Sequence, residues 1–302
     1  MFCVLFDVKI RQLLAEIHLF SLSPSFPLTS KYIYDASKAF PPSHNAKYLF
    51  GLYMPKLHYD NNTACISGQF LSLALRHSIC TILVLEAMHR TLERRLLRMD
   101  HDRDQLIHES TNVQEVELPR RLFRRLGSSK ESLGPDSDPL PILRYLWQRK
   151  ESMCQWPIPS PNSSNGYPLV RAVNGRSIDL IRFLLDRGAD PALRGALAIK
   201  VAIQKKDLKL VKMLIEYEEK VVLEDVTRKK KKVADRVTVT PTMLDMAVKA
   251  DARHIVRYFM EEKGAIPSMK ALLVISGANF SIPCLIVCLK AHSLGHSASK
   301  RQ

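Results

Sequence analysis

Apolar residues recur at the same spacing in three stretches of the C-terminal half of the chain. With Ala172, Ala202 and Ala247 as origins, apolar residues stand three positions before and one position after each origin. They return in pairs eight and nine, and twelve and thirteen, positions after it. Residues spaced three or four apart share one face of a helix, so each stretch predicts a pair of short helices. Seven columns in three stretches make 21 positions: Leu169, Ala172, Val173, Leu180, Ile181, Leu184, Leu185, Ile199, Ala202, Ile203, Leu210, Val211, Leu214, Ile215, Leu244, Ala247, Val248, Ile255, Val256, Phe259 and Met260.

The first stretch, residues 166–191, resembles the ankyrin repeat. Tyr167-Pro168-Leu169-Val170 stands where that family has its Thr-Pro-Leu-His turn, and Gly188-Ala189-Asp190 matches the turn that ends its second helix. Local physics agrees with the resemblance, because Pro168 suits the first turn of a helix and Gly188 can take the left-handed conformation that ends one. The resemblance implies a stack of helix pairs that binds other proteins.

The second and third stretches depart from the family pattern. Leu197-Ala198-Ile199-Lys200 lacks the proline, and Glu218 replaces the closing glycine. Thr242-Met243-Leu244-Asp245 keeps only the Thr and the Leu, and Gly264 comes one residue late. We therefore expect this stack of helix pairs to be less rigid than an array of repeats that all keep the family pattern. An unrelated array of helical hairpins, such as HEAT-type pairs, remains the alternative.

An insertion separates the second stretch from the third. The origins lie 30 and then 45 residues apart, and residues 219–239 account for the excess. This segment contains Arg228, Lys229, Lys230, Lys231 and Lys232, followed by Arg236. A basic run in a surface loop is a candidate nuclear localisation signal, and the alternative is a solvated loop that no import receptor binds.

Residues 78–110 carry a heptad pattern without Gly or Pro. Ile82, His89, Leu96 and Arg103 alternate with Leu85, Leu92, Met99 and Leu106. The pattern predicts one long helix, which either forms a coiled-coil homodimer through 82–106 or packs as a single amphipathic helix on the rest of the chain. The polar His89 and Arg103 weaken the coiled-coil interpretation.

The remaining segments complete an all-α fold class. Residues 1–77, interrupted by prolines, predict an irregular N-terminal region that is disordered or holds short, loosely packed helices. Residues 111–139 combine a basic turn, Pro119 to Leu126, with a linker. Ile142-Leu143 and Leu146-Trp147 predict a half-repeat that opens a short ankyrin-like solenoid of helix pairs over 140–275, and 276–302 form a tail.

Composition narrows the class of protein. Lys and Arg number 45 against 30 Asp and Glu, a net charge of +15, which suggests an acidic partner or a chain directed to the nucleus. Six scattered cysteines are typical of reduced thiols in an intracellular protein. The apolar start of the chain is too short for a signal peptide, and the apolar runs are too short for a membrane span. We expect a soluble protein of the nucleus or cytoplasm.

Motifs for catalysis, cofactors and metals do not occur in the sequence. It has no phosphate loop, no Gly-rich dinucleotide turn, no nucleophile elbow and no His-Glu-x-x-His helix. Cys284, Cys288, His292 and His296 are spaced four apart, but on one helix they stretch along about 18 Å and cannot converge on one zinc ion. We expect neither an enzyme nor a bound cofactor or metal.

The sequence therefore predicts an adaptor that binds an acidic protein partner. In the ankyrin family, binding falls on the turns and on the exposed side of the first helices. The alternative is a nuclear DNA-associated regulator that dimerises through the heptad helix, but the basic region that such a protein needs before the heptads is missing. Carried over position by position, the partner-binding residues are Tyr167, Val170, Arg171, Asn174, Arg194, Lys200, Gln204, Lys205, Asp245 and Lys249, with Asn165, Gly166 and Pro241 beside them.

Overall fold

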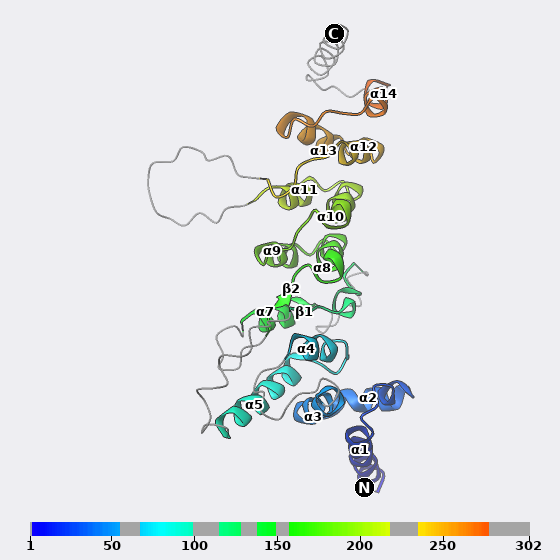
Figure 1. Cartoon of the computed structure of the whole chain (residues 1–302). Coiled ribbons are helices and arrows are strands. Elements are labelled where there is room, and N and C mark those ends of the chain that lie inside the picture. The colour runs from blue at the N-terminus through cyan, green and yellow to red at the C-terminus, as the bar shows by residue number, and fades with distance from the viewer. Residues whose placement is uncertain are drawn as a thin grey trace. The chain divides into compact units, whose positions relative to one another are not determined.

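The computed structural model describes residues 2–54, 67–98, 115–127, 138–148, 157–217 and 235–277. The protein is mainly helical, as the sequence predicts. It divides into two compact units, unit 1 from Met1 to Ser164 and unit 2 from Asn165 to Gln302. Figure 1 labels the helices and strands. The predicted boundaries near 77, 110 and 139 do not separate these units, because the elements around them all belong to unit 1.

Unit 1 begins with one 20-residue helix and several shorter ones, in the region for which the sequence predicts either disorder or short, loosely packed helices. The prolines start helices here instead of breaking them: Pro27 lies in the first turn of η1, and Pro42 opens α3. Ser30 and Ser67 cap α2 and α4 by accepting hydrogen bonds from the N–H groups of Ile33 and Phe70. The elements are α1 (Phe2–Ser21), η1 (Phe26–Leu28), α2 (Lys31–Ala39), α3 (Pro42–Tyr53) and α4 (Gly68–Ala74).

The heptad-patterned segment forms α5 (Ile82–Arg98). Leu85, Met88, His89 and Leu92 are buried, and α5 packs against α3 and α7 (Leu140–Gln148) inside unit 1. The polar seam residue His89 places its Nδ1 3.1 Å from a carboxylate oxygen of Glu93, one turn later. The seam residues Leu85, His89 and Leu92 thus pack inside unit 1, and Met99, Arg103 and Leu106 lie outside the described residues.

Two very short strands close unit 1. β1 (Val116–Glu117) pairs in parallel with β2 (Pro159–Ser160), with Val116 opposite Pro159. The basic turn that follows β1 forms η3 (Arg120–Phe123), with Phe123 buried. The predicted half-repeat residues of α7 are buried too, but α7 belongs to unit 1, where it packs on α5.

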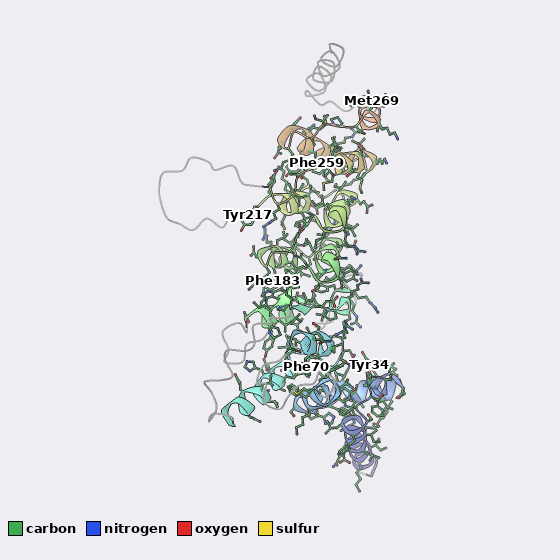
Figure 2. All side chains as sticks on the ribbon, viewed as in Figure 1. Tyr34, Phe70, Phe183, Tyr217, Phe259 and Met269 are labelled. Carbon is green, nitrogen blue, oxygen red and sulfur yellow. The ribbon has the colours of Figure 1, made fainter. Side chains whose placement is uncertain are left out.

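Unit 2 contains the three predicted helix pairs. They are α8 (Ser163–Asn174) with α9 (Ile178–Asp186), α10 (Leu193–Gln204) with α11 (Leu208–Ile215), and α12 (Pro241–Lys249) with α13 (Arg253–Arg257). All 21 repeat positions are buried, none with more than 6% of its surface exposed. Within this unit α10 packs on α11 and α12, while α12 packs on α13 and α14 (Met269–Gly277). Phe259, which is fully buried, and Met269, the first residue of α14, are labelled in Figure 2.

The turn inside each pair has the same backbone conformation. Arg176, Lys206 and Asp251, each four residues after an origin alanine, have positive φ of 52°, 54° and 47°. The next N–H in each case donates to the carbonyl of the origin alanine, at 3.1, 3.2 and 3.0 Å. This is the Schellman ending of a helix, which usually uses glycine. The repetition could not be read from the sequence, because none of the three residues is glycine.

The first two pairs also begin alike. Ser164, Asn165 and Gly166 have positive φ, and Arg194, Gly195 and Ala196 repeat this 30 residues later. The right-handed part of each first helix therefore starts after the left-handed turn, and Pro168 falls in its first turn, as expected. The third pair begins with an extended Thr240 followed by Pro241.

The late glycine of the third pair has a structural counterpart. Residues Tyr258–Glu262 form a π-helical segment, η7, that continues α13. Gly188 follows Leu185 by three residues, whereas Gly264 follows Met260 by four. Both glycines have positive φ, 89° and 64°. The wider π turn accommodates the one extra residue before Gly264, so the second helix of the third pair also ends at a glycine in the left-handed conformation.

Candidate binding surface

The predicted partner-binding residues of the first pair lie along α8. Tyr167, Val170, Arg171 and Asn174 are half-buried, and Asn165 is exposed in the left-handed turn before them. The buried side of the same helix carries Leu169, Ala172 and Val173. The helix period thus separates a packed side from an accessible side, as the sequence predicts.

The second pair joins its predicted residues to those of the first. Lys205 Nζ donates to the backbone carbonyl of Asn174 at 2.5 Å, and Arg176 Nη2 donates to the carbonyl of Lys205 at 3.2 Å. These bonds link the turn of the first pair to the turn of the second. Lys205 is therefore a structural link, while Arg194 and Gln204 are exposed and Lys200 is half-buried.

In the third pair, Asp245 is engaged by the chain itself. Its Oδ1 accepts a hydrogen bond from Ser268 Oγ at 2.7 Å, and the same Oγ accepts from the N–H of Ala271 in α14. The segment before α14 thus folds onto α12 at a predicted contact position. Lys249 and Pro241 remain exposed. The sequence holds no signal for this contact, because it depends on the path of the chain after Gly264.

The candidate nuclear-signal residues Arg228 to Lys232 lie outside the described residues. Arg236, which follows them, has a fixed structural role. Its N–H donates to Ile215 O at 2.6 Å, and its Nη1 donates to the carbonyls of Met213 and Glu216 at 3.0 and 2.9 Å. Glu216 also forms an antiparallel bridge with Asp235, so the two ends of the insertion are held together.

A charged cluster beside this bridge was not found from the sequence. Lys263 Nζ lies 2.5 Å from Asp235 Oδ1 and 3.3 Å from Glu216 Oε1, and Tyr258 OH donates to Glu216 Oε1 at 2.8 Å. Burial and the bond to Glu216 raise the pKa of Tyr258. Burial alone lowers the pKa of Lys263, but its bonds to Asp235 and Glu216 outweigh that effect and raise it. The cluster ties the insertion to the third helix pair.

The second helix pair is the most basic of the three helix pairs in unit 2. Residues 193–215 contain one acidic residue, Asp207, whose Oδ1 accepts from the N–H of Leu210 and so caps α11. The basic residues of this segment are Arg194, Lys200, Lys205, Lys206, Lys209 and Lys212. Lys212 is paired with Glu262 at 2.8 Å, and Arg194, Lys206 and Lys209 are exposed. Positive charge therefore gathers around the turns of the second pair.

Unit 1 buries several titratable groups. His18 is fully buried and stacks on the ring of Tyr48, with centroids 3.7 Å apart, and its Nδ1 lies 3.4 Å from Nε2 of His44. Burial, with smaller contributions from His44 and His77, lowers the pKa of His18 to about 4. Burial likewise raises the pKa of the Cys80 thiol to about 12. At neutral pH both groups are uncharged parts of the core.

Across the described ranges, no cluster of three or more His, Cys, Asp or Glu side chains has the arrangement of a metal site. No helix in those ranges has the length and apolar character needed to cross a membrane. Comparisons with protein-family models, curated proteins and solved structures find no match for this chain.

Proposed function

We propose that this protein is a non-enzymatic adaptor that binds a protein partner through ankyrin-like repeats in unit 2. The observation that carries the proposal is the repetition of one helix pair three times, with 21 buried positions and the same left-handed turn. Stacked helix pairs leave one side of the first helices and their turns for contact with other molecules. The absence of known catalytic motifs from the sequence supports a role in binding.

The contact surface is centred on the second pair. Arg194, Lys200 and Gln204 belong to this surface, with Arg171 and Asn174 next to it on the first pair and Lys249 on the third. Lys205 and Asp245 support it from within the fold, because both are bonded to the chain. The charge around the second pair favours an acidic segment of an intracellular partner, in the nucleus or the cytoplasm. The dimeric DNA-associated alternative gains no support, since the buried seam residues of α5 pack inside unit 1.

Paired charge reversals test this surface. A variant with Arg194→Glu and Lys200→Glu changes the proposed contact face, and a control with Arg182→Glu and Arg257→Glu makes the same charge change on the second helices. Partners are captured from cell lysate treated with nuclease, and the affinity of the most enriched one is measured with purified protein. We expect the first variant to weaken binding at least about tenfold, and the control to weaken it less than about threefold.

Two results would contradict the proposal. Equal loss of affinity in both variants would show a general charge effect instead of a defined surface. Loss of every captured partner on nuclease treatment would favour binding to nucleic acid. Circular dichroism of both variants checks that the helices are intact.

A further inference from the structure

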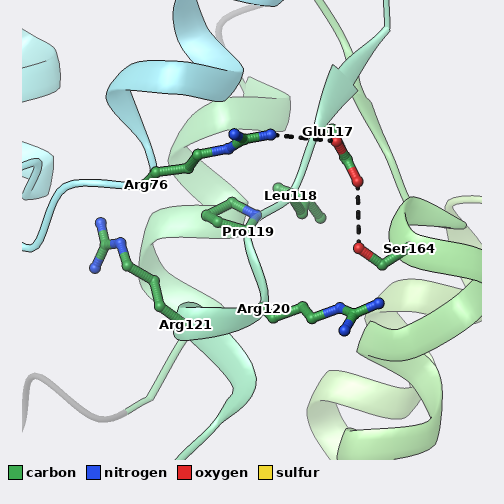
Figure 3. Close-up of a pocket in the computed structure, with 7 residues that line it drawn as sticks. All are labelled: Arg76, Glu117, Leu118, Pro119, Arg120, Arg121 and Ser164. Carbon is green, nitrogen blue, oxygen red and sulfur yellow. Dashed lines mark hydrogen bonds and ion pairs between the residues drawn. The ribbon is translucent and has the colours of Figure 1, made fainter.

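Unit 1 contains a pocket of about 410 Å³ where the chain leaves β1 and enters η3 (Figure 3). Arg76 reaches it from the turn after α4, and Ser164 from the start of α8. The residues that line it are Arg76, Glu117, Leu118, Pro119, Arg120, Arg121 and Ser164. All of them belong to unit 1, whereas the surface proposed above consists of residues of unit 2.

Hydrogen bonds hold the wall of this pocket in place. The N–H groups of Glu117 and Leu118 donate to the hydroxyls of Ser72 and Ser163, each at 2.8 Å. Arg121 Nε donates to Leu75 O at 2.6 Å, and its Nη2 lies 3.5 Å from Cys80 O. These bonds fix β1 and η3 against α4, so the pocket is formed before any ligand arrives.

Two polar side chains of the pocket, Arg76 and Ser164, already contact one carboxylate, that of Glu117. Arg76 Nη2 lies 3.7 Å from Glu117 Oε2, and Ser164 Oγ donates to Glu117 Oε1 at 3.2 Å (Figure 3). The side chains of Arg76 and Glu117 are 60% and 54% exposed, and an ion pair in that much water contributes little. Arg76 can therefore turn from Glu117 to a second anion at low cost.

The charge of the pocket matches a dianion. Three arginines and one glutamate give it a net charge of +2. Burial lowers the pKa of Arg121, because water is partly excluded from its guanidinium, and a bound anion restores favourable interactions to that charge. A phosphate monoester carries a charge of about −1.5 to −2 at neutral pH and offers three acceptor oxygens. The guanidinium fork binds such oxygens in pairs.

We propose that this pocket binds a phosphoryl group on a phosphorylated side chain of a partner protein. Arg76 and Arg120 contact the phosphoryl oxygens, Ser164 donates its hydroxyl, and Arg121 adds positive charge from the pocket wall. The Pro119 ring offers an apolar contact for the stem of the modified residue. A protein ligand is favoured over nucleic acid, because the cations surround one small pocket that also contains the carboxylate of Glu117, instead of following a row of phosphates.

The test uses the full-length protein and a fluorescent peptide with one phosphoserine in an acidic context, compared with its unphosphorylated form. We expect the phosphorylated peptide to bind at least about tenfold more tightly. The double variant Arg76→Lys, Arg120→Lys keeps the positive charge but removes the planar guanidinium groups. It should lose most of the difference in affinity between the phosphorylated and unphosphorylated peptides. Arg144→Lys on α7, an exposed arginine outside the pocket, should change affinity less than about twofold. Glu117→Gln removes the competing carboxylate and should tighten binding several-fold.

Competition experiments separate the possible sources of the phosphoryl group. Inorganic phosphate should displace the peptide only at concentrations far above the Kd of the phosphorylated peptide. If inorganic phosphate binds as tightly as the peptide, or if a single-stranded oligonucleotide binds more tightly and is weakened by the same double variant, the proposal is overturned. Equal affinity for the two peptide forms overturns it as well. These outcomes do not depend on the unit 2 surface, whose reversal variant should bind the phosphopeptide normally.

Discussion

At the scale of single residues, the turns of unit 2 place L-amino acids in a conformation that favours glycine. Arg176, Lys206 and Asp251 have positive φ at equivalent positions in the three helix pairs. A left-handed conformation costs an L-residue about 1–2 kcal/mol. The surrounding hydrogen bonds to the origin alanines impose this conformation nonetheless, so the repeat carries the same conformational cost in each turn.

Substitution of Lys206 by glycine should stabilise unit 2. Lys206 is exposed, so the change removes little packing, and we expect the free energy of unfolding to rise by about 0.5–1 kcal/mol. Gly188→Ala is the opposite change at φ 89°, where a Cβ would have no atom within 4 Å, and it should lower the free energy by about 1 kcal/mol. Urea unfolding followed by circular dichroism measures both. A Lys206→Gly protein no more stable than the wild type would contradict the turn assignment.

His18 makes the stability of unit 1 depend on pH. Its pKa is about 4 in the folded chain and near 6.5 in the unfolded chain, so the unfolded state binds more protons between these values. As pH falls from about 6.5 to 4, stability should therefore decrease, by about 3 kcal/mol from this group. Above pH 7 the group is neutral in both states and contributes no pH dependence.

Urea unfolding at pH 7, 6 and 5 measures this effect. Trp147 is buried in α7, so its fluorescence reports on unit 1. His18→Phe keeps an aromatic ring on Tyr48 but cannot titrate, and its stability should fall less steeply over this range. The same slope in both proteins would rule out His18 as the cause.

At the scale of elements, the spacing of apolar residues determines how the helix pairs pack. Leu184 lies in α9 and Leu214 in α11, and both are fully buried. Both occupy the same column of the repeat, twelve residues after their origins. Their burial confirms the sequence prediction that this column packs in the interior of the helix pairs.

Truncation of either leucine should destabilise unit 2 strongly. We expect Leu184→Ala and Leu214→Ala each to lower the free energy of unfolding by about 2–5 kcal/mol, because each leaves a cavity in packed structure. Leu83→Ala makes the same chemical change at a position that is 59% exposed, and it should cost less than about 0.5 kcal/mol. Urea unfolding provides the comparison. Similar small effects at all three positions would show that the repeat positions are not packed as described.

Other features of the elements were not accessible from the sequence. The π-helical turn Tyr258–Glu262 resolves the late Gly264, which in the sequence is simply a departure from the family pattern. The prolines of the N-terminal region left disorder and short helices as alternatives, and in the structure Pro27 and Pro42 lie in the first turns of helical segments. Proline is tolerated in the first turn of a helix and disruptive inside it, and the sequence alone does not show which position it occupies.

At the scale of the whole molecule, some residues of the heptad pattern and of the basic segments have structural roles that differ from those their sequence patterns predict. Leu85 and Leu92 fit a coiled-coil seam, and the structure buries them against neighbours in unit 1. Arg121 belongs to the basic turn after β1, where its Nε donates to the carbonyl of Leu75, the residue that caps the end of α4. A surface charge and a buried structural charge look identical in a sequence, because only the neighbours differ.

The spacing of apolar residues predicts the three helix pairs, their 21 buried positions and the division of α8 and α10 into packed and accessible sides. These features follow from the spacing of apolar residues within each helix and do not depend on contacts between distant parts of the chain. Only the folded structure shows that Lys205 and Asp245 are bonded to the chain and that Arg236 holds the ends of the insertion. It also shows that Arg76 lines one pocket together with Arg120 and Arg121 of η3. Such contacts join residues distant along the chain, and their formation depends on the folded path of the backbone.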